Sequence, residues 1–169
     1  MLGMACAVAA GAVGCGGAAA ALQVRLLIDH PVGLLDAPVR ISVIGLRPGA
    51  RVDVGATSDD ADGRAWSSSV VFAANRAGIV DLAKMPPMAG SYSGVAPAGL
   101  LWSMSRIGGD PQTSFYALAD PTRTATVAAV TVTAVVGGRI VASARLARGV
   151  LAPGVTGQVE RPAKVGFYG

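Results

Sequence analysis

The segment from Gly90 to Gly94 reads Gly-Ser-Tyr-Ser-Gly and comes close to the motif that presents the nucleophilic serine of serine hydrolases. That motif requires a serine at its centre, on a strained turn from a strand into a helix. Here Tyr92 occupies the centre, and Pro97 and Gly99 follow so closely that we expect no helix after it. The segment therefore predicts a glycine-rich turn without a catalytic serine.

A serine triad also needs a histidine base, and the only histidine of the chain is His30. Asp29 and Asp36 lie near it in the sequence, which suggests comparison with a metal site or an acid–base pair. One histidine with two loop carboxylates is a small ligand set for a metal ion. We therefore expect a solvated loop at the start of a strand.

A second acidic cluster, Asp59, Asp60 and Asp62, invites comparison with a calcium-binding loop. It lacks the alternating oxygen ligands and the terminal glutamate of such a loop, so we expect a polar turn. The pair Gly108-Gly109 has no strand-to-helix context for phosphate binding. From these residues the sequence predicts no catalytic residue, no metal ligand and no bound cofactor.

The composition limits the classes of protein to which the chain can belong. Its 169 residues suffice for one domain with a core and are few for two. Hydrophobic residues make up 52% and charged residues 14%, so we do not expect intrinsic disorder. The net charge is +4, but the arginines are scattered without a basic cluster, so we expect no nucleic-acid partner.

The N-terminal segment differs from the rest of the chain. Residues 1–21 carry no charge and are rich in Ala and Gly, which predicts a signal- or lipoprotein-like leader and tether. Cys15 is the lipidation candidate and would anchor the chain in the cell envelope; otherwise we expect a cytoplasmic protein. The leader has no basic residue at its start, and Ala12 stands where Leu is usual, so an unstructured leader and a misassigned start codon stay open. Both cysteines, Cys6 and Cys15, lie here, so we expect no disulfide in the body.

Beyond the leader, short stretches of alternating apolar and polar residues are separated by turns, and no window shows the period of a capped helix. This pattern predicts an all-β domain of two packed sheets over residues 22–150. Val39, Ile41 and Val43 should face its core, and Gly137-Gly138 should form a hairpin turn. The predicted strands cover residues 38–46, 50–58, 65–75, 78–82, 99–104, 114–119, 124–136 and 139–150.

Three blocks of sequence occur in a fixed order: DAPVRISVIGLRPGARVDVGA (36–56), DADGRAWSSSVVFAANRAGIVDL (60–82) and GSYSGVAPAGLLWSM (90–104). Together they resemble the N-terminal domain of the acyl-CoA thioester hydrolase / bile acid-CoA:amino acid N-acyltransferase family. Asn75 stands where the family more usually has an acidic residue. The residues that carry this signature, in a structural role, are Trp66, Gly94, Pro97, Gly99, Leu100, Leu101, Trp102, Ser103 and Met104.

The resemblance implies an immunoglobulin-like two-sheet β-sandwich, followed by a linker over residues 151–169 that leads towards an α/β-hydrolase domain. In the family that second domain holds the Ser or Cys nucleophile, the Asp and the His. It cleaves acyl-CoA thioesters or passes the acyl group to an amine. None of those triad residues has a counterpart in this sequence, so the resemblance transfers no catalytic residue.

We therefore expect a truncated or accessory piece of an acyl-CoA thioesterase that is inactive alone. Its partner would be an α/β-hydrolase domain, supplied in trans or lost, and acyl-CoA would bind only through that domain. The alternative is an envelope-anchored, immunoglobulin-like binding module with no enzymatic role. In that case the chain would touch the membrane only through a lipid on Cys15.

Overall fold

The computed structural model describes residues 23–117, 127–149 and 155. Within these residues the chain forms two β-sheets and one short helix, α1 (Gly99–Trp102). The predicted leader with Cys15 lies outside the described residues, as does all of the predicted linker except residue 155. In the described part, no helix is long and apolar enough to cross a membrane.

The two sheets differ in size. In the described ranges the smaller sheet has the order β1-β3-β6, and the larger has the order β2-β10-β9-β4-β5-β7, with β8 also paired to β5. The paired strands run antiparallel except β2 and β10, which are parallel. The smaller sheet contains β1 (Arg25–Asp29), β3 (Arg40–Ile44) and β6 (Val80–Asp81). The larger contains β2 (Val32–Leu34), β4 (Arg51–Asp59), β5 (Ala65–Ala73), β7 (Ala89–Gly90), β8 (Ser105–Arg106), β9 (Val127–Val136) and β10 (Arg139–Gly149).

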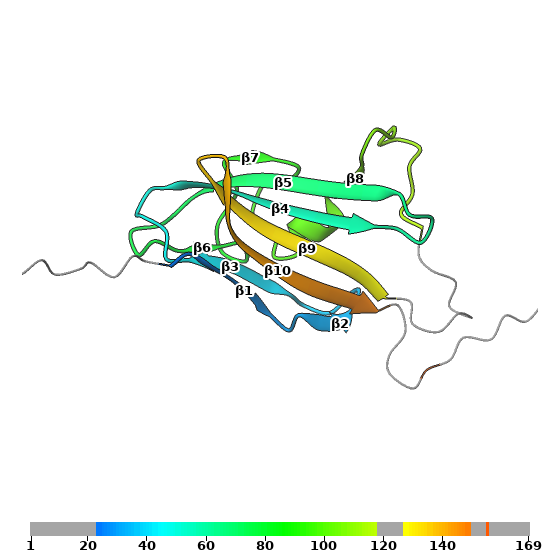
Figure 1. The fold of residues 1–169 in the computed structure, drawn as a ribbon, viewed down its shortest axis with the longest axis horizontal. Helices are drawn as coiled ribbons and strands as arrows, with labels where there is room; N and C mark the ends of the chain where they lie inside the picture. Colours follow the sequence, from blue (N-terminus) through cyan, green and yellow to red (C-terminus); the bar gives the residue numbers. More distant parts are fainter. Residues whose placement is uncertain (1–22, 118–126, 150–154, 156–169) are drawn as a thin grey trace, which may run out of the picture.

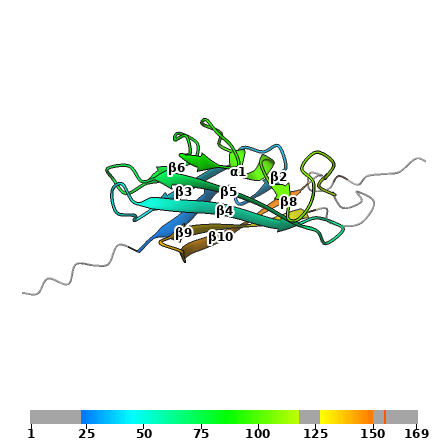
Figure 2. The same ribbon diagram turned by 90° about the horizontal axis from the view of Figure 1, so that it is seen from above.

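The sheets pack as two layers. Figure 1 shows β4, β5, β9 and β10 as long strands that cross the molecule, with β1, β3 and β6 in a second layer below them. Strand β1 also lies against β10, so the smaller sheet closes over one edge of the larger. Helix α1 contacts β5 and β4, and the view from above shows it beside β5 (Figure 2). The prediction of an all-β, two-sheet sandwich is confirmed.

Alternation along the strands builds the core between the layers. In β3 the predicted inward residues Ile41 and Val43 are fully buried, and Val39 just before the strand is nearly so. Strands β4 and β5 alternate in the same way, because successive side chains of a strand point to opposite faces. Phe72 of β5 is the largest apolar side chain that this core buries completely.

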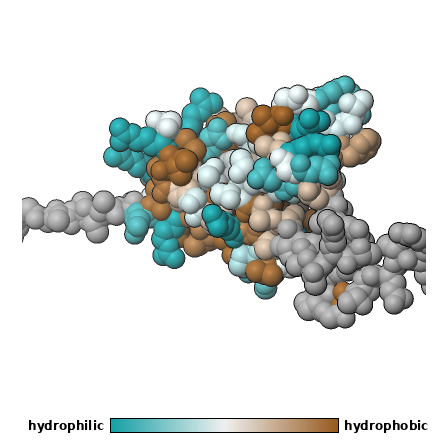
Figure 3. Space-filling view, turned by 45° about the vertical axis from the view of Figure 1, so that its right-hand side comes forward, coloured by the Kyte–Doolittle hydropathy of each residue, from teal (hydrophilic) through white to brown (hydrophobic). Residues whose placement is uncertain are grey.

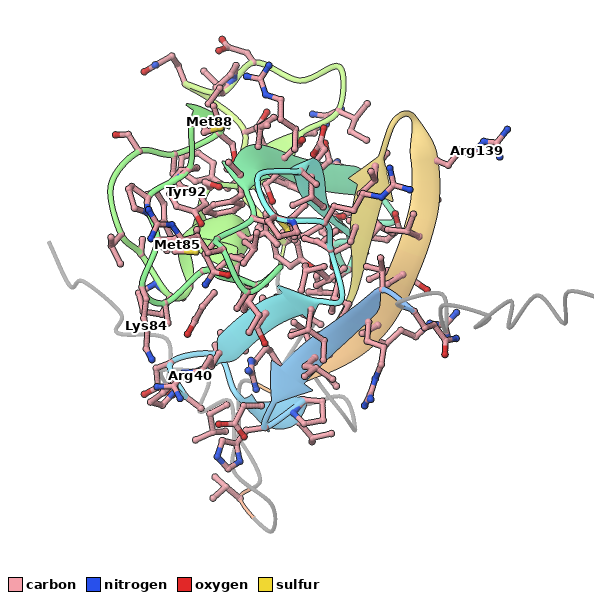
Figure 4. The ribbon with its side chains drawn as sticks, turned by 90° about the vertical axis from the view of Figure 1, so that its left-hand side faces the viewer. Arg40, Lys84, Met85, Met88, Tyr92 and Arg139 are labelled. Atoms are coloured by element: carbon pink, nitrogen blue, oxygen red, sulfur yellow. The ribbon has the colours of Figure 1, made fainter. Side chains whose placement is uncertain are left out.

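The predicted glycine hairpin is also confirmed. Gly137 and Gly138 join β9 to β10 with φ angles of 57° and 77°. Two consecutive residues with positive φ match the twist of the flanking strands, and glycine adopts this backbone conformation without steric cost. The neighbouring Arg139 extends away from the body of the domain (Figure 4).

The structure corrects the prediction of a strand over residues 99–104. Residues Gly99–Trp102 form α1, in which the Trp102 N–H donates to the Ala98 carbonyl at 3.2 Å and the Ser103 N–H to the Gly99 carbonyl at 3.0 Å. The expectation that no helix follows the Gly90–Gly94 turn is wrong for the same reason. A short apolar run cannot be assigned to strand or helix from its periodicity. Here the contacts of the segment with β5 determine its conformation.

The prediction of a strand over residues 114–119 is wrong for its described part, residues 114–117, which are irregular. Asp110 organises this region: its carboxylate accepts the Gln112 N–H at 2.9 Å, and its carbonyl accepts the Ser114 N–H at 2.9 Å. Aspartate before proline favours such turns. Strands β1 and β2 were not predicted, because the turn at His30 and Pro31 between them interrupts the alternation that would have shown them.

Candidate functional site

A cavity of about 780 Å³ lies at one end of the sandwich. Its wall combines the connection from β2 to β3, the ends of β5, β9 and β10, the segment around α1, and residues 114–116. These parts come from distant regions of the sequence, so only the folded chain creates the space. The lining residues are Leu35, Asp36, Ala37, Pro38, Val39, Ser58, Trp66, Ala96, Pro97, Ala98, Leu101, Trp102, Met104, Ser114, Phe115, Tyr116, Ala128, Val130 and Arg148.

The signature segment forms one side of this cavity. Pro97, Leu101, Trp102 and Met104 line it, whereas Leu100 points into the core and is fully buried. The Leu100 carbonyl accepts a hydrogen bond from the Ser68 hydroxyl of β5, which fixes the helix to the sheet. Part of the signature segment therefore shapes the pocket, and part of it belongs to the core.

Tyr92 supports α1 from the residue position where a hydrolase would carry its nucleophile. It is nearly buried, its ring lies 5.8 Å from that of Trp102, and it points towards the helix (Figure 4). A Cβ atom at Gly99 would lie 2.6 Å from two atoms of the Tyr92 ring, so the ring can pack here only against glycine. Burial raises the pKa of Tyr92, and its hydroxyl has no hydrogen-bond partner within the described residues.

Two other residues of the Gly90–Gly94 turn, Ser91 and Gly94, also have structural roles. The Ser91 hydroxyl is 2.8 Å from that of Ser103, which links the turn to the end of α1. Gly94 has a φ of 75°, a backbone conformation that L-amino acids with side chains rarely adopt. Of the two serines that flank Tyr92, Ser91 is thus bonded to another serine.

Trp66 is nearly buried and is held by the acidic turn that precedes β5. Its indole N–H donates to Asp60 Oδ2 at 3.1 Å, while Asp60 Oδ1 accepts the Arg64 N–H at 2.8 Å and the Asp62 N–H at 3.0 Å. Burial raises the pKa of Asp60, but these hydrogen bonds outweigh it and hold the pKa below its ordinary value. The carboxylate that resembled a calcium ligand therefore closes a turn.

Tyr116, in the segment that follows β8, joins this network. Its ring lies 5.4 Å from that of Trp66, and its hydroxyl is 2.7 Å from the hydroxyl of Ser58. Ser58 in turn donates to the Ala129 carbonyl of β9 at 2.9 Å. The polar atoms along this wall are thus already bonded to one another.

Arg148 is the residue of this site that sequence analysis missed. It lies on β10, two positions after the buried Leu146, and is itself only 2% exposed. Its Nη1 donates to the His30 carbonyl at 3.2 Å, whereas Nε and Nη2 have no hydrogen-bond partner within the described residues. The alternation of inward and outward residues along β10 could have predicted its burial, because Leu146 and Arg148 must lie on the same face of the strand.

The predicted solvated loop around His30 agrees with the structure. His30 is exposed and lies 3.4 Å from the Asp29 carboxylate, and Asp36 is exposed at the cavity. Among the described residues, no group of three or more His, Cys, Asp and Glu side chains could hold a metal ion.

The surface near the cavity carries unusually exposed apolar side chains. Trp102 is 65% exposed and Phe115 82%, and both also line the cavity; Val95 and Leu35 are exposed as well. Figure 3 shows brown, apolar areas between the polar side chains on this side of the molecule. A patch of exposed large apolar side chains marks an interaction site.

The fold and site define a class: a two-sheet β-sandwich domain with a mostly apolar pocket. The family described as the acyl-CoA thioester hydrolase/BAAT N-terminal region matches residues 36–161. This match covers most of the chain, and the chain belongs to that family.

Individual relatives agree with this assignment. The chain is 34% identical over 97 residues to mouse acyl-coenzyme A amino acid N-acyltransferase 1, covering 57% of this chain and 22% of the relative. It is 42% identical over 71 residues to mouse bile acid-CoA:amino acid N-acyltransferase, covering 42% and 17%. It is 38% identical over 80 residues to human acyl-coenzyme A thioesterase 1, covering 46% and 19%. The matched segments thus span about a fifth of the length of these relatives.

Proposed function

We propose that this chain is a non-catalytic, immunoglobulin-like sandwich that works with an α/β-hydrolase domain in acyl-CoA thioester hydrolysis or acyl transfer. The exposed apolar surface beside the signature segment carries this proposal. Trp102 and Phe115 lie there in the open, although large aromatic side chains are normally buried in an isolated domain. A partner domain that covers them would bury apolar area and stabilise the pair.

The hydrolase domain would supply the nucleophile, the acid and the histidine, and it would contact acyl-CoA. The sandwich would hold the position of that domain and complete the surroundings of its acyl site. The family membership and the names of the relatives, which are acyl-CoA thioesterases and N-acyltransferases, support this division of roles.

A chimaera tests the proposal. The full chain replaces the matching N-terminal region of human acyl-coenzyme A thioesterase 1, and hydrolysis of a long-chain acyl-CoA is compared with that of the same enzyme lacking the region. We expect the chimaera to recover activity and the chain alone to have none. The variant Trp102→Ser with Phe115→Ser should lose the gain, whereas Ile140→Ser, which is 68% exposed on β10, should keep it.

Two results would contradict the proposal. Hydrolysis by the chain alone that disappears with Ser91→Ala or Ser93→Ala would make it an independent enzyme. Equal activity of the chimaera with and without the apolar pair would remove the surface from the interface.

We also propose that Cys15 is the site of a lipid anchor, on the sequence of the leader alone. Mass spectrometry of the chain expressed in a bacterium with an active lipoprotein pathway would show a lipid mass on Cys15. An unprocessed N-terminus, unchanged by Cys15→Ser, would contradict this and favour a cytoplasmic protein.

A further inference from the structure

The charge of Arg148 sits in an unusual position. The residue is only 2% exposed and lies in the wall of the cavity. Among the described residues, no carboxylate forms an ion pair with it. Arginine stays protonated in proteins, so it cannot relieve burial by losing its charge. A buried cation without a partner destabilises a fold, and its retention needs a reason.

The free nitrogens of Arg148 have a definite geometry. Nη1 is held by the His30 carbonyl at 3.2 Å, which leaves Nε and Nη2. These two nitrogens share one edge of the guanidinium and direct two N–H groups side by side, which is the arrangement that a carboxylate accepts with both oxygens. Among the described residues, this buried edge of Arg148, which is the edge that recognises a carboxylate, has no hydrogen-bond partner.

Gly33 makes room for this arrangement. A Cβ atom at Gly33 would lie 2.7 Å from Arg148 Nη1 and 3.3 Å from the Cβ of Ala37. A larger residue at position 33 would therefore displace the guanidinium from its contact with β2. The site of the charge is built by the parallel pairing of β2 with β10, which sets Gly33 opposite Arg148.

The remaining wall is mostly apolar, with the exposed Asp36 and with Ser114 among its polar residues. Leu35, Val39, Leu101, Met104 and Val130 line the cavity, and the hydroxyls of Ser58 and Tyr116 are already bonded to each other. A volume of about 780 Å³ lies within the range of about 300–1,000 Å³ found for pockets that bind small molecules. A ligand that fits must combine a single carboxylate with an apolar body.

We propose that this cavity binds an amphipathic monocarboxylate, with the carboxylate on Nε and Nη2 of Arg148 and the apolar body against α1 and β9. This site belongs to the sandwich itself and does not depend on a hydrolase partner. An acidic side chain of another protein could meet Arg148 with the same chemistry, but it would leave most of the apolar cavity unfilled. The apolar wall therefore favours the small molecule.

The chain contains its own reporters for binding. Its only two tryptophans, Trp66 and Trp102, both line the cavity, so a bound ligand should change their fluorescence. The full chain is titrated with decanoate and, in parallel, with 1-decanol, which has the same apolar body and no charge. We expect a saturable change with decanoate and at least about tenfold weaker binding of the alcohol, because a charge-assisted pair is lost.

Variants then assign the carboxylate to Arg148. Arg148→Met should lower the affinity for decanoate at least about tenfold and leave that for 1-decanol unchanged. Arg145→Met is the matched control, because Arg145 lies on the same strand but is exposed on the other face, and it should bind as the unchanged chain does. Gly33→Val should weaken decanoate binding by displacing the guanidinium.

The comparison of acid and alcohol in the unchanged chain remains decisive even where a variant fails to fold. Equal affinity for decanoate and 1-decanol would overturn the inference and leave a purely apolar cavity. The absence of any saturable signal with decanoate would also overturn it and point to a protein carboxylate as the partner of Arg148. Equal effects of Arg148→Met and Arg145→Met would do the same.

Discussion

Replacing Gly99 with alanine should destabilise the domain, although alanine is normally the better residue for a helix. The Cβ atom of alanine would lie 2.6, 2.6 and 2.8 Å from three atoms of the Tyr92 ring. Ordinary carbon–carbon contacts are about 3.5–4.0 Å, so the ring or the helix must move by most of an ångström. The ring cannot move freely, because Trp102 and the core hold it.

The expected size follows from two opposing effects. Overpacking a filled site costs about 1–3 kcal/mol. Exchanging glycine for alanine in a helix returns about 0.5–1 kcal/mol, and less in a helix of a single turn. The free energy of unfolding should therefore fall by about 1–2 kcal/mol.

A double-mutant cycle separates the contact from other causes. Tyr92→Leu keeps an apolar side chain but lacks the ring atoms that the new Cβ would meet. In this background Gly99→Ala should be neutral or stabilising by up to about 1 kcal/mol. The four proteins are unfolded with urea and followed by far-ultraviolet circular dichroism, and the coupling energy should exceed about 1 kcal/mol. An equal cost of Gly99→Ala in both backgrounds would refute the explanation.

Two further predictions concern the titration of Asp60 and Tyr92. Burial raises the pKa of Asp60, but its hydrogen-bond donors lower it by more, so the folded pKa lies below the ordinary value. The stabilisation that this gives is therefore present above the ordinary value near pH 4 and is lost as the pH falls through the folded pKa. Asp60→Asn should therefore flatten the fall of the melting temperature between about pH 5 and pH 2, and parallel melting curves would contradict this. Burial raises the pKa of Tyr92, so its contribution is present below about pH 10 and lost as the pH rises through the folded pKa. Tyr92→Phe should remove that alkaline loss and cost nothing at neutral pH, as urea unfolding would show; a loss above about 1 kcal/mol would mean that the hydroxyl has a partner.

The strands that form the core could be predicted because their pattern is local. Ile41 and Val43 in β3, like Val52 and Val54 in β4, alternate with polar neighbours, and each pair is fully buried. The Gly137-Gly138 turn is likewise determined by the two residues that form it. These elements need no knowledge of what lies across the sheet.

The predictions that failed concern segments whose conformation depends on distant partners. The run Gly-Leu-Leu-Trp has no period long enough to distinguish strand from helix. It becomes α1 because Tyr92 packs on Gly99 and the Ser68 hydroxyl bonds the Leu100 carbonyl. Strand β2 is too short to show a pattern, and it exists by pairing in parallel with the end of β10.

The sequence by itself determined the all-β class and the inward face of the long strands. Membership of the thioester hydrolase family was also readable from Trp66 and the signature segment. The pocket and its charge were decided only by the tertiary structure. Alternation places Arg148 on the inner face of β10, where it pairs with Gly33 and bonds the carbonyl of His30. Two of its buried nitrogens have no hydrogen-bond partner within the described residues, beside a mostly apolar cavity. Such a site depends on contacts between residues more than a hundred positions apart, which no local pattern encodes.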